Sequence, residues 1–419
     1  MRSLLNVLRG SRPAHWLLSG LAVVVALTCT VGLTVAIGGP AAQAGPAAAP
    51  ACSPAWVTAW QAATQPAPAD PSLAGATLRM VVRPQVGGSE VRVRLSNAFG
   101  ETPLQAAAIT AAGPDDRTRP VRFAGRGEVT IAPGTDVLSD PVPLTVEAGH
   151  PLAVGMHLPV VPDVLTQHAV ALQTSYVSRA GGTTPVDSWL VLAGVDVLAA
   201  RPVNAVVAVG DSITDGVGSD PDADERWTDA LSARLAGRGG AAAMAVLNAG
   251  ISGNRLLGDE APLRRFDRDV TAAAGVSDIV LHIGTNDIAT GRGAAEIIAG
   301  MQGFAQRARA AGKRVFLTTV TPSDAGLHGT PSAVAVREAV NAWVLRHGNE
   351  HADGVFDFAA AVADPARPTH LLPEYDAGDG LHLSPAGYRA LAAAVEPTGL
   401  SGSPCLADTA PVRVRLTNG

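Results

Sequence analysis

The sequence predicts an α/β domain built on a parallel β-sheet, preceded by a β-sandwich or jelly-roll domain. Between Trp56 and about Pro202, many short strand-like runs are separated by Pro, Gly and Asp, and little helix is expected. After Pro202, strand-like runs alternate with helix-like stretches, which is typical of a parallel sheet with helices on both faces. A chain of 419 residues is long enough for two domains that each have a core.

The first domain is expected to span 56–202. Its two clearest strands alternate, or nearly alternate, apolar and polar residues, and they are joined through Gly87 and Gly88. Further strand-like runs follow at intervals. The expected strands lie at 77–83, 90–95, 129–131, 152–158 and 168–177.

The second domain is expected to span 203–400. Parallel sheets of this kind bind ligands at the carboxyl ends of their strands, so residues that directly follow a strand are the candidates for a site. The expected strands lie at 203–209, 243–248, 278–283, 314–320 and 355–358. The expected helices lie near 225–237, 293–312, 332–348 and 384–395.

The first 44 residues have the pattern of an export signal. Three arginines precede an uncharged, mostly apolar stretch at 16–37, and Ala42-Gln43-Ala44 offers a small-x-small cleavage site. The same stretch is long enough to span a bilayer, so retention as a membrane anchor is the alternative. Either way the bulk of the chain is expected outside the cytoplasm, with 45–55 as an Ala/Pro-rich linker and 401–419 as a tail.

Cysteine use agrees with export. Cys29 lies in the signal, which leaves Cys52 and Cys405 in the mature chain. An even number in an exported protein predicts one disulfide, here joining the two ends of the globular region. The net charge of −6 and the pI of about 5.9 argue against a nucleic-acid partner, which requires a basic face.

A first candidate site stands at Gly210-Asp211-Ser212, directly after the strand at 203–209. A serine used in catalysis needs its hydroxyl exposed at a helix N-terminus after a rigid strand. Asp and Ser are also ordinary turn and N-cap residues, so this motif alone is not specific.

Three further segments add the missing chemical groups. Gly253 follows the second parallel strand, and its backbone N–H can approach a ligand closely. Asn286 follows the third strand and offers a side-chain amide. Asp379 and His382 lie just before the last helix and offer a carboxylate three residues from an imidazole.

Together these residues provide what acyl transfer requires. Ser212 needs a base to take its proton, and His382 is the well-placed candidate. Asp379 can fix the tautomer of the imidazole and stabilise its charge. The N–H groups of Ser212 and Gly253 and the amide of Asn286 are the expected oxyanion donors. The serine lacks the flanking pattern of the Gly-x-Ser-x-Gly elbow.

The four segments, in this order, resemble the blocks of the SGNH (GDSL) hydrolases over about residues 203–397. The resemblance implies a flavodoxin-like three-layer domain and a serine esterase that needs no metal. By position it assigns Ser212 as nucleophile, Gly253 and Asn286 as oxyanion donors, and Asp379 and His382 as the remaining members of the triad.

Flanking residues are similar to those of secreted actinobacterial SGNH esterases, which carry a β-sandwich ahead of the catalytic domain. They also resemble the arylesterase and xylan-associated branch. One departure is Thr285, where that subgroup has a bulkier apolar residue. The matching residues are Trp56, 91–100, 172–176, Arg226, Trp227, 253–257 and 266–269.

Other polar residues are expected to have no catalytic role. His282 lies within a strand and is interpreted as a packed histidine, and His351 and Asp353 at a helix end are expected to face solvent. His328 and His370 lie in loops that can border the pocket.

Asp211 is expected to accept backbone N–H bonds in the nucleophile turn. The acidic residues Asp220, Asp222, Asp224 and Glu225 lack EF-hand spacing and are expected to form a solvated loop. We therefore expect neither a metal nor a cofactor.

The expected function is a secreted serine esterase that cleaves short-chain acyl esters, including acetyl groups on carbohydrate, in a small-molecule or polysaccharide substrate. A lipase or phospholipase is the second enzyme interpretation, and a carbohydrate-binding protein with an inactive hydrolase scaffold is the alternative from another class. A monomer is expected, with membrane contact only if the N-terminal signal is retained. The sandwich aromatics Trp56, Trp60, Tyr176 and Trp189 either bind glycan or build its core.

Overall fold

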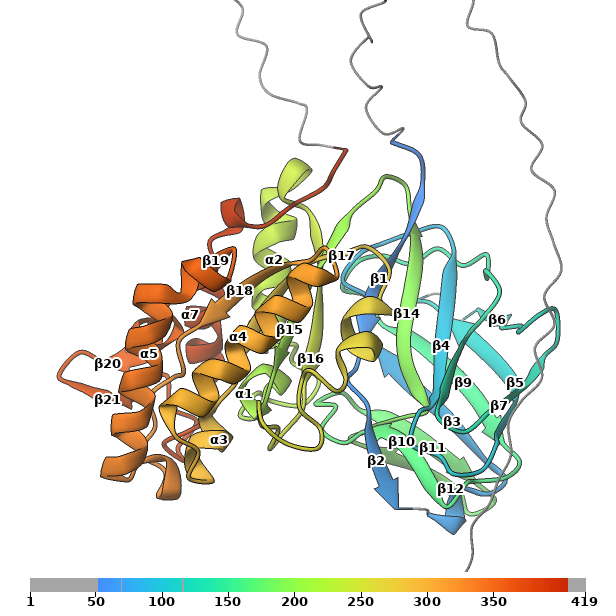
Figure 1. Cartoon of the computed structure of the whole chain (residues 1–419). Helices are drawn as coiled ribbons and strands as arrows, with labels where there is room; N and C mark the ends of the chain where they lie inside the picture. Colours follow the sequence, from blue (N-terminus) through green and yellow to red (C-terminus); the bar gives the residue numbers. More distant parts are fainter. Residues whose placement is uncertain (1–51, 69, 115–116, 406–419) are drawn as a thin grey trace, which may run out of the picture. The chain divides into compact units, whose positions relative to one another are not determined.

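The computed structural model describes residues 52–68, 70–114 and 117–405, all of which belong to one compact unit, Pro50–Gly419 (Figure 1). The predicted export signal at 1–44, the linker residues 45–51 and the tail residues 406–419 lie outside the described residues. Within the described ranges, no helix is both long enough and apolar enough to cross a membrane.

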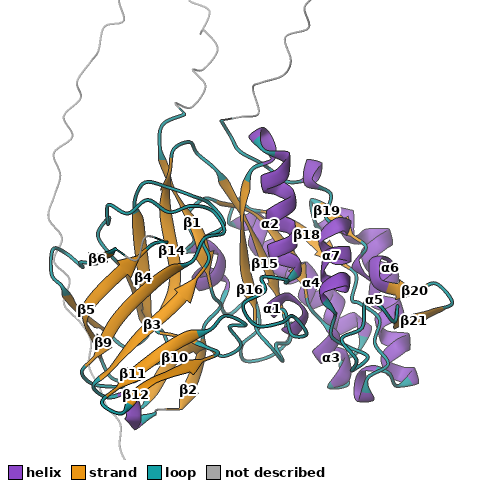
Figure 2. Cartoon of the chain, turned by 180° about the vertical axis from the view of Figure 1, so that it is seen from behind, coloured by secondary structure: helices purple, strands orange, loops and turns teal. Residues whose placement is uncertain are grey.

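The N-terminal part consists of antiparallel β-sheets, as predicted (Figure 2). One sheet has the order β1-β14-β4-β8, and a second has the order β12-β11-β3-β9-β5-β6, with β7 also pairing with β5. A small sheet, β13-β10-β2, completes it. The strands are β1 Ala55–Gln61, β2 Gln65–Pro68, β3 Ala76–Val82, β4 Val91–Asn97, β5 Leu104–Ala112, β6 Thr118–Pro120, β7 Glu128–Ile131, β8 Thr135–Leu138, β9 Leu152–Leu158, β10 Val164–His168, β11 Ser175–Arg179, β12 Gly182–Val186, β13 Trp189–Leu190 and β14 Leu192–Ala199.

Two details of the predicted strand pattern differ. The strands joined through Gly87 and Gly88 do not pair with each other, because β3 and β4 belong to different sheets. Each of the two strands contributes buried residues to the sandwich. The single run predicted at 168–177 is two strands, since β10 ends at His168 and β11 begins at Ser175.

The sandwich tryptophans help to decide between the core and glycan interpretations. Trp60 and Trp189 are buried and meet edge to face, with ring centroids 4.8 Å apart. The Trp189 indole N–H donates to the carbonyl of Val81 (2.8 Å). These two rings therefore build the core, while Trp56 and Tyr176 are half-buried beneath arginines.

The C-terminal part is a five-stranded parallel sheet with the order β16-β15-β17-β18-β19. This is the flavodoxin-like order, in which the first strand lies between the second and the third. The strands are β15 Asn204–Gly210, β16 Met244–Gly250, β17 Val276–His282, β18 Arg314–Thr318 and β19 Gly354–Phe356. The helices are α1 Ser212–Asp215, α2 Trp227–Arg238, α3 Thr285–Ala289, α4 Ala294–Ala310, α5 Pro331–His351, α6 Phe358–Val362 and α7 Pro385–Ala394; β20 Ala363–Asp364 and β21 Arg367–Leu371 form a hairpin.

Alternate residues of the central strand face two different cores. Val206 and Ala208 pack in a cluster with residues of α2, α6 and α7. Val207 and Val209 pack in a second cluster that contains residues of α4 and α5 and continues into the sandwich. The period of two along β15 thus gives the three-layer arrangement and joins the sandwich to one face of the sheet.

Backbone and side-chain hydrogen bonds also connect the sandwich to the α/β domain. Thr58 of β1 donates its N–H to the carbonyl of Ala274 (3.0 Å), and its hydroxyl accepts the Ala274 N–H (2.8 Å). The Gln61 amide donates to the carbonyl of Asp269 (2.8 Å), which lies in a π-helical turn at Asp267–Thr271.

The predicted disulfide is present. Cys52 and Cys405 are bonded, with Cα atoms 5.5 Å apart. Cys52 precedes β1, and Cys405 follows the last helix, so the bond links the start of the sandwich to the segment after the α/β domain.

The acidic loop is exposed at Asp220 and Asp222, as expected of a solvated segment, but it is also bound to the sandwich. Asp222 accepts the N–H and the hydroxyl of Thr174 (2.7 and 2.6 Å) and the side-chain amide of Gln173 (2.5 Å). Asp224 pairs with Arg83 of the sandwich (2.8 Å). The carboxylates therefore hold the loop on the sandwich.

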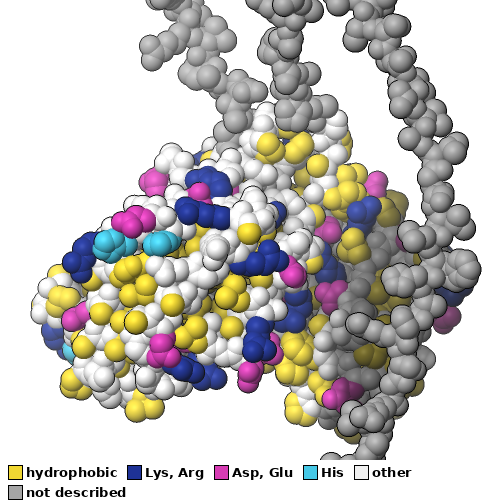
Figure 3. Space-filling model, in the orientation of Figure 1, with side chains coloured by type: hydrophobic (Ala, Val, Ile, Leu, Met, Phe, Trp, Pro, Cys, Tyr) yellow, Lys and Arg dark blue, Asp and Glu magenta, His cyan; other side chains and the backbone are white. Residues whose placement is uncertain are grey.

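Across the face in Figure 3, charged side chains of both signs are interspersed.

Because one apolar cluster crosses both domains, residues 203–419 expressed alone should be poorly soluble or weakly active. Removing the sandwich exposes the apolar residues of the sheet face that it covers. Soluble yield and ester hydrolysis of the fragment would be compared with those of the full chain. A soluble fragment with full activity on all esters would identify the sandwich as an independent module.

Candidate active site

Ser212 lies at the turn between β15 and α1, as the sequence predicts. It is the first residue of α1 and is 6 % exposed. Asp211 caps the helix by accepting the N–H of Ile213 (3.1 Å), which is the structural role expected for it. A Cβ atom at Gly210 would lie 2.5 Å from the carbonyl oxygen of His282, so the turn requires glycine there.

The structure brings His382 and Asp379 to this serine. The Nε2 atom of His382 lies 2.9 Å from Oγ of Ser212, and its Nδ1 atom lies 2.6 Å from Oδ2 of Asp379. The other carboxylate oxygen of Asp379 accepts the backbone N–H groups of Leu381 (2.9 Å) and His382 (2.8 Å). A hydrogen-bonded chain thus runs from carboxylate to imidazole to hydroxyl.

Asp379 is held in its ionised form. Partial burial acts to raise the pKa of its carboxyl group, but the hydrogen bonds from the His382 side chain and backbone outweigh it, and the net pKa is lowered. An ionised Asp379 accepts from Nδ1–H, which leaves Nε2 free to accept the proton of the Ser212 hydroxyl.

Gly253 and Asn286 follow the two strands that flank β15 in the sheet. Gly253 has a φ of +78°, a conformation that favours glycine, and it is exposed. Asn286 is the second residue of α3, and its Nδ2 donates to the carbonyl of Asn254 (2.9 Å). One amide hydrogen therefore fixes the side chain, and the second remains for a ligand.

Arg265 is a buried residue that the sequence analysis did not identify. It holds together the carboxyl ends of β15 and β16 and the loop that carries Gly253. Arg265 is 1 % exposed and pairs with Asp269. Its guanidinium donates to the carbonyls of Ala249 (2.9 Å) and Gly210 (3.2 Å) and to Oδ1 of Asn254 (3.2 Å). The only sequence signal is the spacing of four between Arg265 and Asp269, which does not reveal burial.

Asp287 holds the same loop from the other side. Its carboxylate accepts the N–H groups of Leu256 (2.7 Å) and Leu257 (2.9 Å). Burial raises the pKa of Asp287, although its two backbone hydrogen bonds act to lower it. Asp287 directly follows Asn286, so the loop that carries Gly253 and the helix that carries Asn286 are tied together.

Asp211 and His282 are buried groups near the serine. Burial raises the pKa of Asp211 to about 7, assisted by the charge of Asp287. Burial lowers the pKa of His282 to about 3, so its imidazole is neutral and shares a hydrogen bond with the Thr318 hydroxyl (2.8 Å). His282 is therefore a packed histidine, as predicted.

The remaining candidate histidines lie in different environments. His351 is half-buried against Trp343 rather than facing solvent, while Asp353 is exposed as expected. His328 is half-buried, and it lies close enough to His382 for their charges to interact. Burial is the main cause that lowers the pKa of His328. The Nε2 atom of His370 lies 3.6 Å from Oδ2 of Asp324. The expectation that the loops of His328 and His370 can border the pocket stays a prediction.

A cavity of about 230 Å³ adjoins Gly253. Most of its lining comes from the loop that follows β16, and the sandwich contributes one side chain at the start of β2. The polar lining residues are Gln65, Ser252, Asn254, Arg255, Asp259 and Glu260.

Residues 208–390 match the model of the GDSL-like lipase/acylhydrolase family. No curated protein matches the chain. Among solved structures, a protein described as lipolytic and of the G-D-S-L family from Desulfitobacterium hafniense DCB-2 is 19% identical, with a TM-score of 0.39 over 47% of this chain and 99% of that one. An acetyl-xylooligosaccharide esterase from Geobacillus Stearmophilus is 22% identical, with a TM-score of 0.35 over 46% of this chain and 91% of that one.

Arg265→Met should lower the free energy of unfolding by about 3–5 kcal/mol, because it removes the buried partner of Asp269 and leaves that carboxylate only Arg268, whose Nε lies 3.6 Å away. Arg292→Met is the matched control, since it removes an exposed pair with Glu296 and should cost less than about 1 kcal/mol. Urea unfolding of both variants measures the difference. Equal losses would mean that the buried pair contributes no more than a surface one.

Proposed function

We propose that this chain is a serine ester hydrolase that acts through an acyl-enzyme, because residues 208–390 match the model of the GDSL-like lipase/acylhydrolase family. The observation that carries the proposal is the hydrogen-bonded chain from Asp379 through His382 to Ser212. Such a chain activates a hydroxyl that is otherwise a weak nucleophile.

The reaction proceeds in two halves. As Oγ of Ser212 attacks the ester carbonyl carbon, Nε2 of His382 takes the hydroxyl proton, and Asp379 stabilises the imidazolium that forms. The tetrahedral intermediate collapses, its bond to the alcohol oxygen breaks, and His382 gives the proton to the departing alcohol. Water then attacks the acyl-enzyme with the same proton transfers, which releases the carboxylic acid and restores Ser212.

Negative charge on the carbonyl oxygen is stabilised by three donors in this proposal. They are the backbone N–H groups of Ser212 and Gly253 and the free amide hydrogen of Asn286. Loss of one such donor typically raises the barrier by about 3–4 kcal/mol. The bonds from Asn286 to Asn254 and from Arg265 to Asn254 hold two of these donors in place before substrate arrives.

We propose short acyl groups on a hydroxyl-rich alcohol, such as an acetylated carbohydrate, as the substrate. The polar cavity beside Gly253 supports this, because amide, guanidinium and carboxylate groups hydrogen-bond sugar hydroxyls. One observation favours the lipid alternative. Leu327 is 68 % exposed in the turn Gly326–His328, which packs against α3.

Export and a metal-free mechanism complete the proposal. The disulfide between Cys52 and Cys405 supports an oxidising compartment, together with the signal-like residues 1–44. The proposed proton transfers need only the side chains named above.

Ser212→Ala should abolish ester hydrolysis and leave the melting temperature nearly unchanged, because it removes one oxygen atom and leaves the surrounding apolar packing intact. Ser212→Ala combined with His382→Ala should be little worse than either change alone, since the two residues act as a unit. Ser332→Ala, at an exposed helix position, is the matched control. Residual activity above a few per cent would point to another nucleophile, and an inactive wild type would favour the binding-protein interpretation.

A series of p-nitrophenyl esters from acetyl to palmitoyl, together with acetylated xylan, should separate the two substrate classes. We expect kcat/KM to be highest for the shortest acyl groups and acetate to be released from xylan. A preference for long chains would instead support the lipase interpretation. Leu327→Ser should then lower activity on palmitoyl but not on acetyl esters.

A further inference from the structure

His168 connects the sandwich to the active-site loops. It is the last residue of β10 and is 3 % exposed. Its Nδ1 lies 2.7 Å from the carbonyl oxygen of Ala63, and its Nε2 lies 3.0 Å from Oδ1 of Asp215 and 3.1 Å from the carbonyl oxygen of Val170.

Every one of these oxygen atoms can only accept a hydrogen bond from His168. Both ring nitrogens must therefore carry hydrogen, and the imidazole is the charged form. Burial acts to lower the pKa of His168, and the charge of Arg226 acts in the same direction. The charge and hydrogen bond of Asp215, together with the hydrogen bond to Ala63, outweigh them, and the pKa is raised. A buried imidazolium–carboxylate pair thus spans the two domains.

Asp215 passes this contact on to the oxyanion loop. It is the last residue of α1, the helix that begins at Ser212, and it is buried. Its second oxygen accepts both the backbone N–H (2.8 Å) and the hydroxyl (2.6 Å) of Ser252. Ser252 directly precedes Gly253, so one carboxylate joins the sandwich, the nucleophile helix and the oxyanion loop.

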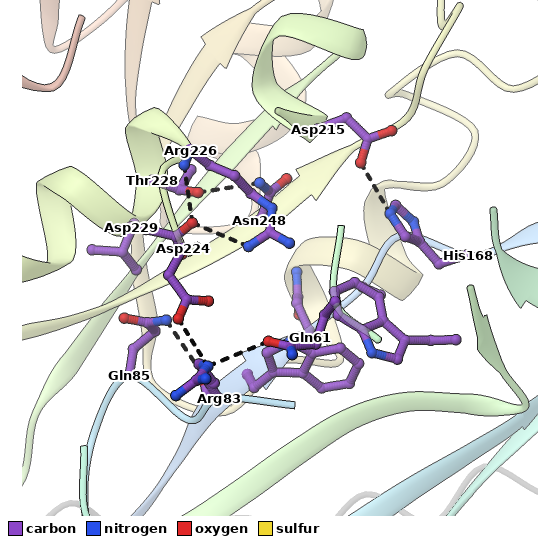
Figure 4. Close-up of a pocket in the computed structure, with 15 residues that line it drawn as sticks. Gln61, Arg83, Gln85, His168, Asp215, Asp224, Arg226, Thr228, Asp229 and Asn248 are labelled. Atoms are coloured by element: carbon purple, nitrogen blue, oxygen red, sulfur yellow. Dashed lines mark hydrogen bonds and ion pairs between the residues drawn. The ribbon is translucent and has the colours of Figure 1, made fainter. Parts of the chain in front are cut away.

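The backbone around Asp215 leaves it little room to move. A Cβ atom at Gly250 would lie 2.2 Å from the backbone nitrogen of Asp215, so α1 rests directly on the end of β16. Figure 4 shows the His168 ring directed at the Asp215 carboxylate on one side of a polar cavity between the domains. The carboxylate orientation therefore depends on its hydrogen-bond donors.

We propose that His168 is a positioning residue of this site: its imidazolium orients Asp215, and through Ser252 this aligns the Gly253 N–H with the developing oxyanion. The inference rests on the proposed esterase function. It makes the sandwich a part of the catalytic apparatus, although His168 touches neither substrate nor the reacting atoms. Without the Nε2–H donor of His168, the Asp215 carboxylate can rotate. The loop that carries Gly253 then loses the carboxylate oxygen that accepts the two Ser252 hydrogen bonds.

The test uses the full chain with His168→Gln, which keeps a polar side chain of similar reach, and His157→Gln in β9 as the matched control. In the folded variant, kcat for acetyl ester hydrolysis should fall by between about 10- and 100-fold, because small misplacements at a reacting centre have effects of that size. KM should change less than twofold. The control should keep wild-type kcat and KM.

A coupling measurement separates positioning from loss of stability. His168→Gln and Asp215→Asn should combine far less than additively in kcat, since both break the same contact. Amide hydrogen exchange should become faster at 252–254 in His168→Gln and not in His157→Gln. An unchanged kcat, or a loss confined to KM with unchanged exchange, would overturn the proposal.

One readout depends neither on the variant folding nor on esterase activity, and a second does not depend on esterase activity. In the ¹⁵N-histidine spectrum of the wild type, one imidazole should show both nitrogens protonated at neutral pH, and a spectrum without such a ring would overturn the inference. If wild type hydrolyses no ester, the proposed function fails. The exchange rates at 252–254 then still decide whether His168 holds the loop.

Discussion

The structure depends on satisfying buried charges at the carboxyl edge of the parallel sheet. Arg265, Asp287 and Asp215 are all removed from water there, and an unpaired charge in such a place costs several kcal/mol. Their partners are backbone and side-chain groups of the loop after β16. The loop that carries Gly253 is ordered because these charges need partners.

This constraint explains why a site on loops can be preorganised. Loops are usually the mobile part of a fold, yet oxyanion donors are effective only when they are fixed before reaction. Two of the three proposed donors lie next to an anchored residue: Gly253 follows Ser252, which is bound to Asp215, and Asn286 precedes Asp287, which binds the loop backbone. The glycines at 210 and 250 allow the nucleophile helix to rest on the strand ends.

Most of the fold and the central residues of the candidate site are predictable from the sequence. Apolar runs separated by helix-like stretches predict the parallel strands to within a few residues. Parallel strands bring their carboxyl ends to one edge of the sheet, whatever path the connecting segments take. For this reason Ser212, Gly253 and Asn286, which follow β15, β16 and β17, can be assigned to one edge from the sequence alone. His382 follows no strand of this sheet, and only the resemblance to the SGNH hydrolases groups it with Ser212 in advance. The disulfide follows from an even count of cysteines.

The rest depends on long-range partners that local pattern does not encode. Alternation along β3 and β4 marks a buried face but not the sheet in which each strand lies, so the connection through Gly87 and Gly88 resembles a hairpin. The acidic residues of the loop at 220–225 resemble a solvated segment until Thr174 and Arg83 are placed beside them.

His168 shows the same limit at the site itself. A histidine at the end of a sandwich strand is more often a core residue than a functional one, and only the arrangement of acceptors around both nitrogens reveals its charge. Its partner Asp215 lies on α1, the helix that begins at Ser212, so in our proposal a domain that supplies no reacting atom fixes the geometry of those that do. The sandwich and the α/β domain share one apolar cluster, a disulfide and this ion pair. Movement of one domain relative to the other would therefore disturb the loop that carries Gly253, and the proposed preorganised site requires a rigid contact between the domains.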